Sequence, residues 1–258
     1  MKNILTKNQV LFWLGFSHLL VFILLLMYYP FNHVRVLGIN SMIKPIKFAL
    51  SIWIYSWTMS LILNYVEDKH KVKTYSWVAV IAMCFEQFAI TSQALRGQLS
   101  HFNRADIYGI ILFTLMGIFI LTITLWTVYI TYIFIKQKTD NLSPVISLGI
   151  KIGLVYFIVF SLFGGYISGL QGHTVGSTDG GSGLLFLNWS TLYGDLRVAH
   201  FFGIHSLQII PLFAILSEKY VSKIYAFRAT QVFSILYFSL ILFSLIQGLM
   251  GLPFISNS

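Results

Sequence analysis

Long, almost uncharged apolar stretches recur along the whole chain and restrict its fold more than any other feature. Of the 258 residues, 57% are hydrophobic and only 10% are charged, a composition too apolar for a soluble domain of this length. A helix needs about 20 consecutive apolar residues to cross the hydrocarbon core of a bilayer. The sequence therefore predicts an all-α, polytopic membrane protein.

Seven stretches meet this length requirement and are predicted to be membrane-spanning helices. Their expected bounds are residues 9–29, 48–66, 75–95, 108–135, 148–169, 196–216 and 226–249. The connections are short except for a glycine-rich loop over residues 170–195, which is longer than most loops between helices. Because no repeat or linker interrupts the chain, we expect residues 1–258 to form a single seven-helix bundle.

The distribution of lysine and arginine predicts the orientation of this bundle. Loops on the side of the N-terminus are the more basic, with Lys69, Lys71, Lys73, Lys136 and Lys138 among their residues. Since short cytoplasmic loops carry an excess of Lys and Arg, we expect the N-terminus in the cytoplasm and the C-terminus outside. The net charge of +9 then reflects basic loops beside anionic lipid, and it requires no nucleic-acid partner.

Polar side chains lie along one face of the second predicted span. Lys47 is followed at helical spacing by Ser51 and Tyr55, which form a stripe running from the outer surface into the membrane. We therefore count Lys47 among the ligand-binding candidates. Lys44, about one turn earlier, is expected to extend its ammonium group to the lipid headgroups.

The third span contains Glu86 near its middle, with Gln93 and Arg96 toward its outer end. A carboxylate at the centre of a bilayer is costly and indicates a functional site by default. We assign Glu86 a catalytic or proton-handling role. The alternative is a simple interhelical hydrogen bond between Glu86 and Gln93, and His18 in the first span is a second candidate partner at matching depth.

The segment GDLRVAHFFGIH at the start of the sixth span contains an unusual number of polar residues for a helix that enters lipid. Four polar side chains lie within one arc of this predicted helix: Arg197, His200, His205 and Gln208. Asp195 falls outside the arc and is expected to cap the helix N-terminus.

Four histidines at the outer level are candidate ligands of a metal: His101, His173, His200 and His205. The last two are five residues apart, unlike an i, i+4 pair, so a shared ion requires a ligand from another segment. One of them facing His101 or His173 would hold haem b between two imidazoles. We favour such a haem- or metal-binding redox protein.

A zinc-dependent membrane hydrolase is an alternative. Zinc held by His101, His173 and His200 would leave one position for a water molecule, as catalytic zinc sites require. Asp179 is an alternative third ligand. Glu86 lies too deep in the membrane to act as the general base of such a site.

A transporter, receptor or lipid-binding protein for an anionic ligand is the third interpretation. Its candidate ligand-binding residues are Lys47, Gln93, Arg96, Asn103, Arg197 and Gln208. We expect the outer halves of the second, third and sixth spans to present these groups to one space beneath the glycine-rich loop, while Glu86 titrates during transport. No inverted repeat supports a transporter, and the sequence leaves open whether the protein is an enzyme.

Several segments resemble those of a family of bacterial multi-pass membrane proteins. These segments are MIKPIKF, QALRGQLSHFN, GHTVGSTDGGSGL, NWS and GDLRVAHFFGIHSLQ, which lie between residues 42 and 211. The resemblance implies a location in the bacterial cytoplasmic membrane. It implies no activity and no cofactor.

Overall fold

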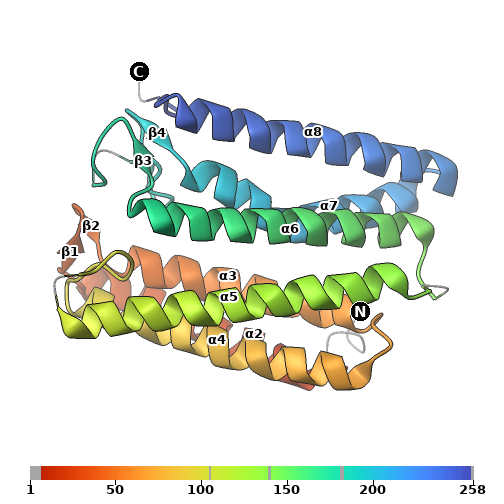
Figure 1. The fold of residues 1–258 in the computed structure, drawn as a ribbon, viewed down its shortest axis with the longest axis horizontal. Helices are drawn as coiled ribbons and strands as arrows, with labels where there is room; N and C mark the ends of the chain where they lie inside the picture. Colours follow the sequence, from red (N-terminus) through yellow and green to blue (C-terminus); the bar gives the residue numbers. More distant parts are fainter. Residues whose placement is uncertain (1–6, 105, 139–140, 181–182, 257–258) are drawn as a thin grey trace. The chain divides into compact units, whose positions relative to one another are not determined.

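The computed structural model describes residues 7–104, 106–138, 141–180 and 183–256. Within these residues, seven helices are long and apolar enough to cross a membrane (Figure 1). They are α2 (Gln9–Tyr28), α3 (Ile43–Leu63), α4 (Lys69–Leu95), α5 (Ile107–Lys136), α6 (Pro144–Leu170), α7 (Arg197–Tyr220) and α8 (Lys223–Leu249). The predicted all-α architecture with seven candidate spans is confirmed for the described residues, whereas the orientation of the termini stays a prediction.

Several helices begin earlier than the apolar stretches that revealed them. The side chain of Asp68 accepts a hydrogen bond from the backbone N–H of Lys71 and caps α4. The Ser143 hydroxyl accepts the N–H of Val145 and caps α6, in which Pro144 is the first residue. Hydropathy marks only the part of a helix that fits the hydrocarbon core, whereas capping residues mark where the helix begins.

Short strands close two of the loops. Between α2 and α3, the 3-10 helix η1 (Tyr29–Phe31) precedes a hairpin of β1 (Arg35–Val36) and β2 (Ile39–Asn40). Between α6 and α7, β3 (Thr174–Val175) pairs antiparallel with β4 (Gly194–Asp195). This second pair sets Thr174 opposite Asp195, and it brings the two ends of the long loop together at the start of α7.

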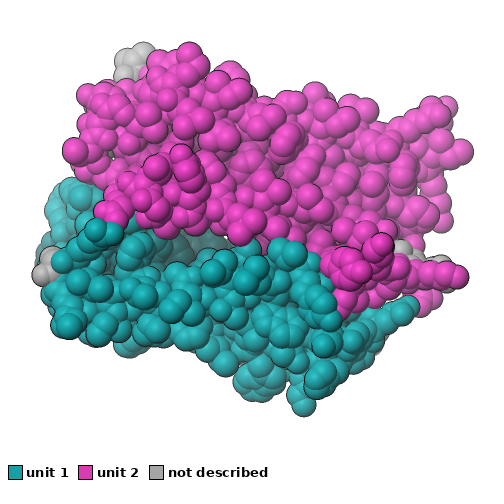
Figure 2. All heavy atoms as spheres, in the orientation of Figure 1, with its two compact units in different colours: residues 1–130 teal, residues 131–258 magenta. Residues whose placement is uncertain are grey.

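The chain divides into two compact units, residues 1–130 and 131–258 (Figure 2). Unit 1 contains α2, α3, α4 and most of α5, and unit 2 contains α6, the long loop, α7 and α8. The interpretation of the chain as one bundle stays a prediction.

In unit 1, tight packing and a buried chain of hydroxyl groups hold the helices together. A Cβ atom on Gly15 would overlap the indole of Trp57, so α2 and α3 are in close contact there. Between α3, α4 and α5, the Thr127 hydroxyl donates to the carbonyl of Ile123 at 2.8 Å. Its oxygen therefore accepts from Tyr75 at 3.1 Å, and the Tyr75 oxygen accepts from Tyr55 at 2.5 Å. Because this series of hydroxyl groups ends on a backbone carbonyl, every member has a hydrogen-bond partner within the helices. We interpret its role as structural.

In unit 2, small residues let α6 and α7 approach closely. A Cβ atom on Gly149 would lie 2.7 Å from that of Ala214, and one on Gly153 would lie 2.8 Å from the carbonyl oxygen of Ser206. Ser206 also donates its hydroxyl to the carbonyl of Gly153 at 3.1 Å. Small residues four apart are a common basis of close helix packing in membranes.

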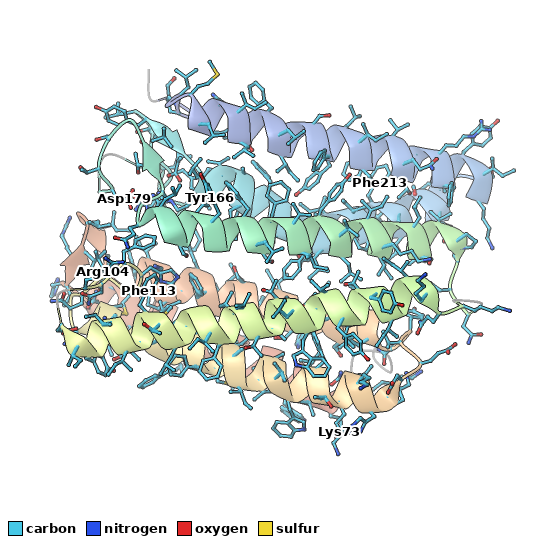
Figure 3. The ribbon with its side chains drawn as sticks, in the orientation of Figure 1. Lys73, Arg104, Phe113, Tyr166, Asp179 and Phe213 are labelled. Atoms are coloured by element: carbon cyan, nitrogen blue, oxygen red, sulfur yellow. The ribbon has the colours of Figure 1, made fainter. Side chains whose placement is uncertain are left out.

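The remaining core of unit 2 joins α8 to this pair. Phe160, Ala199, Ile210, Tyr237 and Ile241 form one buried apolar cluster. On α7, Phe213 (labelled in Figure 3) stacks on Phe233 of α8 with ring centroids 3.9 Å apart. Large apolar side chains on the other faces of α8 are exposed, as expected of surfaces that contact lipid.

Candidate functional site

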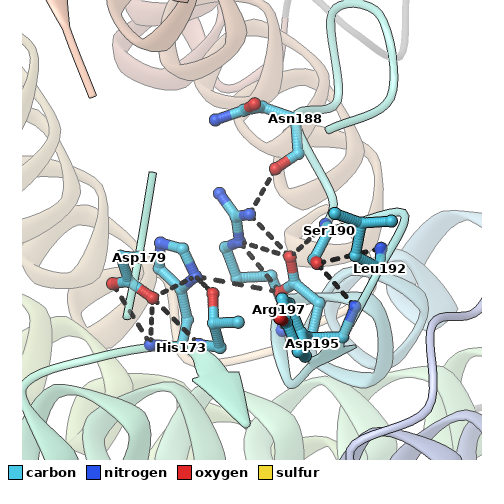
Figure 4. A network of polar contacts seen from close by, with 9 residues as sticks. His173, Asp179, Asn188, Ser190, Leu192, Asp195 and Arg197 are labelled. Atoms are coloured by element: carbon cyan, nitrogen blue, oxygen red, sulfur yellow. Dashed lines mark hydrogen bonds and ion pairs between the residues drawn. The ribbon is translucent and has the colours of Figure 1, made fainter. Parts of the chain in front are cut away.

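Asp195, at the end of β4, is the centre of a hydrogen-bond network in unit 2 (Figure 4). Its carboxylate has no exposed surface and pairs with the Arg197 guanidinium, with 2.9 Å from Nε to Oδ1 and 2.6 Å from Nη2 to Oδ2. It also accepts the backbone N–H groups of Arg197 at 3.0 Å and Ser190 at 2.9 Å. The N-cap of α7 is Leu196, not Asp195 as expected, because Asp195 is held on β4. The Asp195 carboxylate nevertheless accepts the N–H of Arg197, the first residue of the helix.

The charges around Asp195 decide its protonation state. Burial raises the pKa of the carboxyl group, but the hydrogen bonds and charge of Arg197, the N–H of Ser190 and the charge of His173 outweigh it. The net effect lowers the pKa below its ordinary value. Asp195 is therefore ionised at neutral pH and neutralises Arg197, which also donates to the carbonyl oxygen of Asn188. Arg197 thus stabilises the loop, a role that the sequence did not indicate.

His173, the residue before β3, lies between two carboxylates (Figure 4). Its Nδ1 atom is 3.1 Å from Oδ1 of Asp179 and 4.0 Å from Oδ1 of Asp195. Asp179 also accepts the backbone N–H of Thr174 at 2.9 Å. The imidazole therefore links the middle of the long loop to β4. We interpret this role as structural.

Metal binding receives no support from the structure. Among the described residues, no group of three or more His, Cys, Asp or Glu side chains could hold a metal ion. Nδ1 of His200 lies 2.7 Å from the carbonyl oxygen of Phe160, and Nδ1 of His205 lies 3.3 Å from Oε1 of Gln208. These imidazoles have local partners within unit 2. Pairing of either with His101, which belongs to unit 1, stays a prediction.

In unit 1, Lys44 on α3 contacts His101 in the loop after α4. Its Nζ atom lies 3.2 Å from Nδ1 of His101, and the hydroxyl oxygen of Ser100 lies 3.3 Å from the same nitrogen. The His101 ring is near those of Phe48 and Phe113, with centroids 6.2 Å and 6.0 Å away. Lys44, expected to extend to the headgroups, therefore belongs to a polar and aromatic cluster.

Arg96 has a local carboxylate partner as well. Its guanidinium forms an ion pair with Asp106, lies 4.5 Å from the ring centroid of Tyr108 and donates to Oε1 of Gln93 at 2.8 Å. The N–H of Gly109 and the guanidinium of Arg96 lower the pKa of Asp106. Asp106 precedes an apolar stretch, which is a sequence signature of a helix cap. That signature could have identified Asp106 as the cap of α5, placed close to the end of α4 where Arg96 lies.

Glu86 on α4 is buried, with 2% of its surface exposed. Within the described residues its Oε1 atom has no hydrogen-bond partner, and the charge of Lys44 acts on it. Gln93 bonds Arg96 and the carbonyl of Leu99 instead, so the alternative of a Glu86–Gln93 pair is wrong. Nor does His18 take this place, because its Nδ1 atom lies 2.8 Å from the carbonyl oxygen of Leu14 and its ring also bonds the backbone of Met83.

The two remaining predicted ligand-binding residues of unit 1 are Lys47 and Asn103. Both interact with neighbouring groups. Asn103 is buried, and its side chain fills the space where a Cβ atom of Gly109 would lie. In unit 1 the structure thus places Lys44 in contact with His101 and close enough to Glu86 for its charge to act on that carboxyl group. Convergence of these groups with Arg197 and His200 of unit 2 stays a prediction.

By length and composition, the helices are those of a polytopic membrane protein. Comparisons with models of protein families, with curated proteins and with solved structures found no match to this chain.

Proposed function

We propose that the protein is a membrane transporter or receptor for a small anionic ligand, in which Glu86 exchanges a proton as the ligand binds and leaves. The observation that carries this proposal is the buried Glu86 carboxyl group, whose Oε1 has no hydrogen-bond partner among the described residues. An ionised carboxylate without partners is costly in such surroundings. Gln93 and His18, which would give it a structural role, are bonded elsewhere.

The charge at the loop end of unit 1 supports an anion as the ligand. α2 and α4 end there and α3 and α5 begin there, and Figure 3 shows Arg104 at this end. Its basic residues are Arg35, Lys44, Lys47, Arg96 and Arg104. Asp106 is the sole carboxylate in residues 29–47 and 96–106, and it is paired with Arg96. Such an excess of positive charge attracts anions. The charge of Lys44 acts on Glu86, so protonation of Glu86 leaves a larger net positive charge at this end of unit 1, which couples proton uptake to anion binding.

Infrared spectroscopy of the reconstituted protein tests the role of Glu86 without knowledge of the ligand. We expect a carbonyl band of a protonated carboxyl group that changes with pH and is absent from Glu86→Gln. Glu67→Gln, the same substitution at an exposed position, should retain the band. Acetate added at constant pH should change its amplitude in the wild type. The proposal fails if the wild type and Glu86→Gln give the same spectra.

We also propose that the protein lies in a bacterial cytoplasmic membrane with its N-terminus in the cytoplasm. The excess of lysine in the loops on the N-terminal side supports this orientation, and the family resemblance supports the location. In a Cys84→Ala background, a membrane-impermeant thiol reagent applied to intact cells should label Ser177→Cys but leave Glu67→Cys unlabelled. The reverse pattern would show that the orientation is inverted.

A further inference from the structure

The end of unit 2 where α6 and α8 finish and α7 begins carries very few charges, although much of it is exposed. Apart from His173, residues 152–194 contain a single charged side chain, that of Asp179, and residues 229–258 contain none. In a typical water-soluble domain about a quarter of the residues are charged. The few charged groups at this end belong to the network of Figure 4. The exposed surface around that network is therefore neutral and largely apolar.

The exposed apolar faces of α6 and α8 continue into this end of unit 2. On α6, Tyr166 and Leu170 are four residues apart on one exposed face, and Figure 3 shows Tyr166 near the end of the helix. On α8, the exposed Ile246 is followed by Met250 and Leu252, which are exposed as well and lie beyond the last helical residue. Exposed apolar faces of membrane-spanning helices contact lipid. Because the same kind of surface extends past both helix ends, we expect the contact with lipid to extend there too.

The long loop contains a tight turn of residues 184–189, which we call the apolar turn. The N–H of Leu184 donates to the carbonyl oxygen of Trp189 at 2.8 Å and closes it. Leu185 at its tip is 95% exposed, and the neighbouring Phe186 is exposed as well. The φ angle of Phe186 is +65°, in the left-handed region that bulky side chains rarely adopt. The fold thus accepts an unfavourable backbone conformation in a turn that displays two large apolar side chains.

The apolar turn is held in place at its base. Trp189 is buried, and its ring centroid lies 5.4 Å from that of Phe201 on α7 and 6.2 Å from that of Phe254 in the segment after α8. The Arg197 guanidinium donates to the carbonyl oxygen of Asn188. The turn is therefore fixed to both α7 and the C-terminal segment, and the exposure of its tip follows from this packing.

The chemistry of the apolar turn favours lipid over a protein partner. The N–H groups of Leu184, Leu187 and Asn188 donate to carbonyl oxygens within the turn, so these donors need no partner outside it. Lipid chains offer no such partner, whereas a protein interface forms about one hydrogen bond for every 100 to 200 Å². Residues 170–196 contain no lysine or arginine. Attraction to anionic headgroups is therefore not the basis of the contact, and apolar insertion is.

We propose that the apolar turn and residues 250–255 lie in the membrane interface, with Leu185 and Phe186 inserted between the lipids of the bilayer that the helices cross. The partner is the lipid surface itself, whether its headgroups are zwitterionic or anionic. The contact attaches the long loop to the membrane at a second point besides its strand pair with β4. This inference concerns unit 2 and does not depend on the role proposed for Glu86.

Fluorescence quenching of the full chain in phosphatidylcholine vesicles tests this contact. In a Cys84→Ala background, Leu185→Cys carries a nitrobenzoxadiazole fluorophore. Side chains that enter the interface reach about 5 to 10 Å into the boundary between headgroups and acyl chains. We therefore expect strong quenching by lipids with a nitroxide near the headgroup and weak quenching by aqueous iodide. Ser177→Cys, an exposed position of the same loop outside the apolar turn, is the matched control and should show the reverse.

A second set of variants tests whether the contact is apolar. With the fluorophore on Leu192→Cys, an exposed position just after the turn, Leu185→Glu should increase quenching by iodide several-fold, because a carboxylate resists transfer into lipid. Ser177→Glu places the same charge elsewhere in the loop and should leave the quenching unchanged. Replacing part of the phosphatidylcholine by phosphatidylglycerol should have no effect. Leu252→Cys reports on the C-terminal segment and should resemble Leu185→Cys, which keeps the test available if the latter variant fails to fold.

Three outcomes would overturn the inference. Quenching of the Leu185→Cys label by iodide to the same extent as the Ser177→Cys label would place the apolar turn in water. Quenching by neither iodide nor nitroxide lipids would show that protein covers the turn, either a second copy or another part of the chain. Lipid quenching that appears only with phosphatidylglycerol would make the contact electrostatic, contrary to the apolar insertion proposed.

Discussion

Replacing Asp195 by Asn should destabilise unit 2 strongly, because it removes the charge at the centre of a buried network. The carboxylate has no exposed side-chain surface and accepts hydrogen bonds from the Arg197 side chain and from the N–H groups of Arg197 and Ser190. Asn presents an NH₂ group to one set of these donors and leaves the guanidinium without its counter-charge. Removing one partner of a buried ion pair costs about 3 to 5 kcal/mol. Because the Arg197 side chain is 27% exposed and water solvates part of it, we expect about 3 kcal/mol.

The measurement is the free energy of unfolding of the reconstituted protein in mixed micelles, for Asp195→Asn, Arg197→Gln and the double variant. If the two side chains act as a pair, the double variant loses clearly less than the sum of the single losses. Glu67→Gln serves as the exposed control. A loss for Asp195→Asn within about 0.5 kcal/mol of the wild type, the range of ordinary surface substitutions, would refute this reasoning.

The same carboxylate predicts a dependence of stability on pH. Folding lowers the pKa of Asp195 below its ordinary value of 3.8, so the folded state binds its proton less readily than the unfolded state. The contribution of the pair is therefore fully present above about pH 4 and is lost as the pH falls through the folded-state pKa. Between neutral pH and pH 3, stability should fall more steeply in the wild type than in Asp195→Asn.

Two further substitutions test the packing of each unit. Gly153→Ala places a Cβ atom 2.8 Å from the Ser206 carbonyl oxygen and should destabilise unit 2 by about 1 to 3 kcal/mol in the same unfolding assay. The control is Gly165→Ala on the same helix, whose Cβ atom meets nothing within 4 Å and which should be neutral or slightly stabilising. Tyr75→Phe breaks the buried hydroxyl chain and should cost about 1 kcal/mol, whereas Tyr166→Phe, at an exposed position, should cost nothing measurable.

The sequence predicts the helices well because crossing a bilayer imposes one requirement, a long apolar stretch, that is visible residue by residue. It predicts their ends less well. α4 begins at Lys69 rather than at residue 75, because the helix extends beyond its apolar stretch as far as its N-cap, Asp68. Capping side chains were readable in the sequence, and hydropathy alone gives them no weight.

The partners of the charged residues could not be predicted in the same way. Helical periodicity places Arg197 on a face with His200, but Asp195 lies on a strand whose pairing with β3 decides where its carboxylate points. Strands of two residues have no periodic pattern to reveal them. The positive φ angle of Phe102 is equally invisible, because the neighbouring Asn103 is the residue type that usually adopts it. Contacts set by loop geometry therefore became known only from the structure.

The close approach of α6 and α7 constrains how this protein can evolve and move. At Gly149 and Gly153 any larger side chain would collide with the opposite helix, so few substitutions are tolerated along this contact, whereas the exposed apolar faces of the helices can vary more freely. We therefore expect any change of shape within unit 2 to move α6 and α7 together and to bend the chain elsewhere.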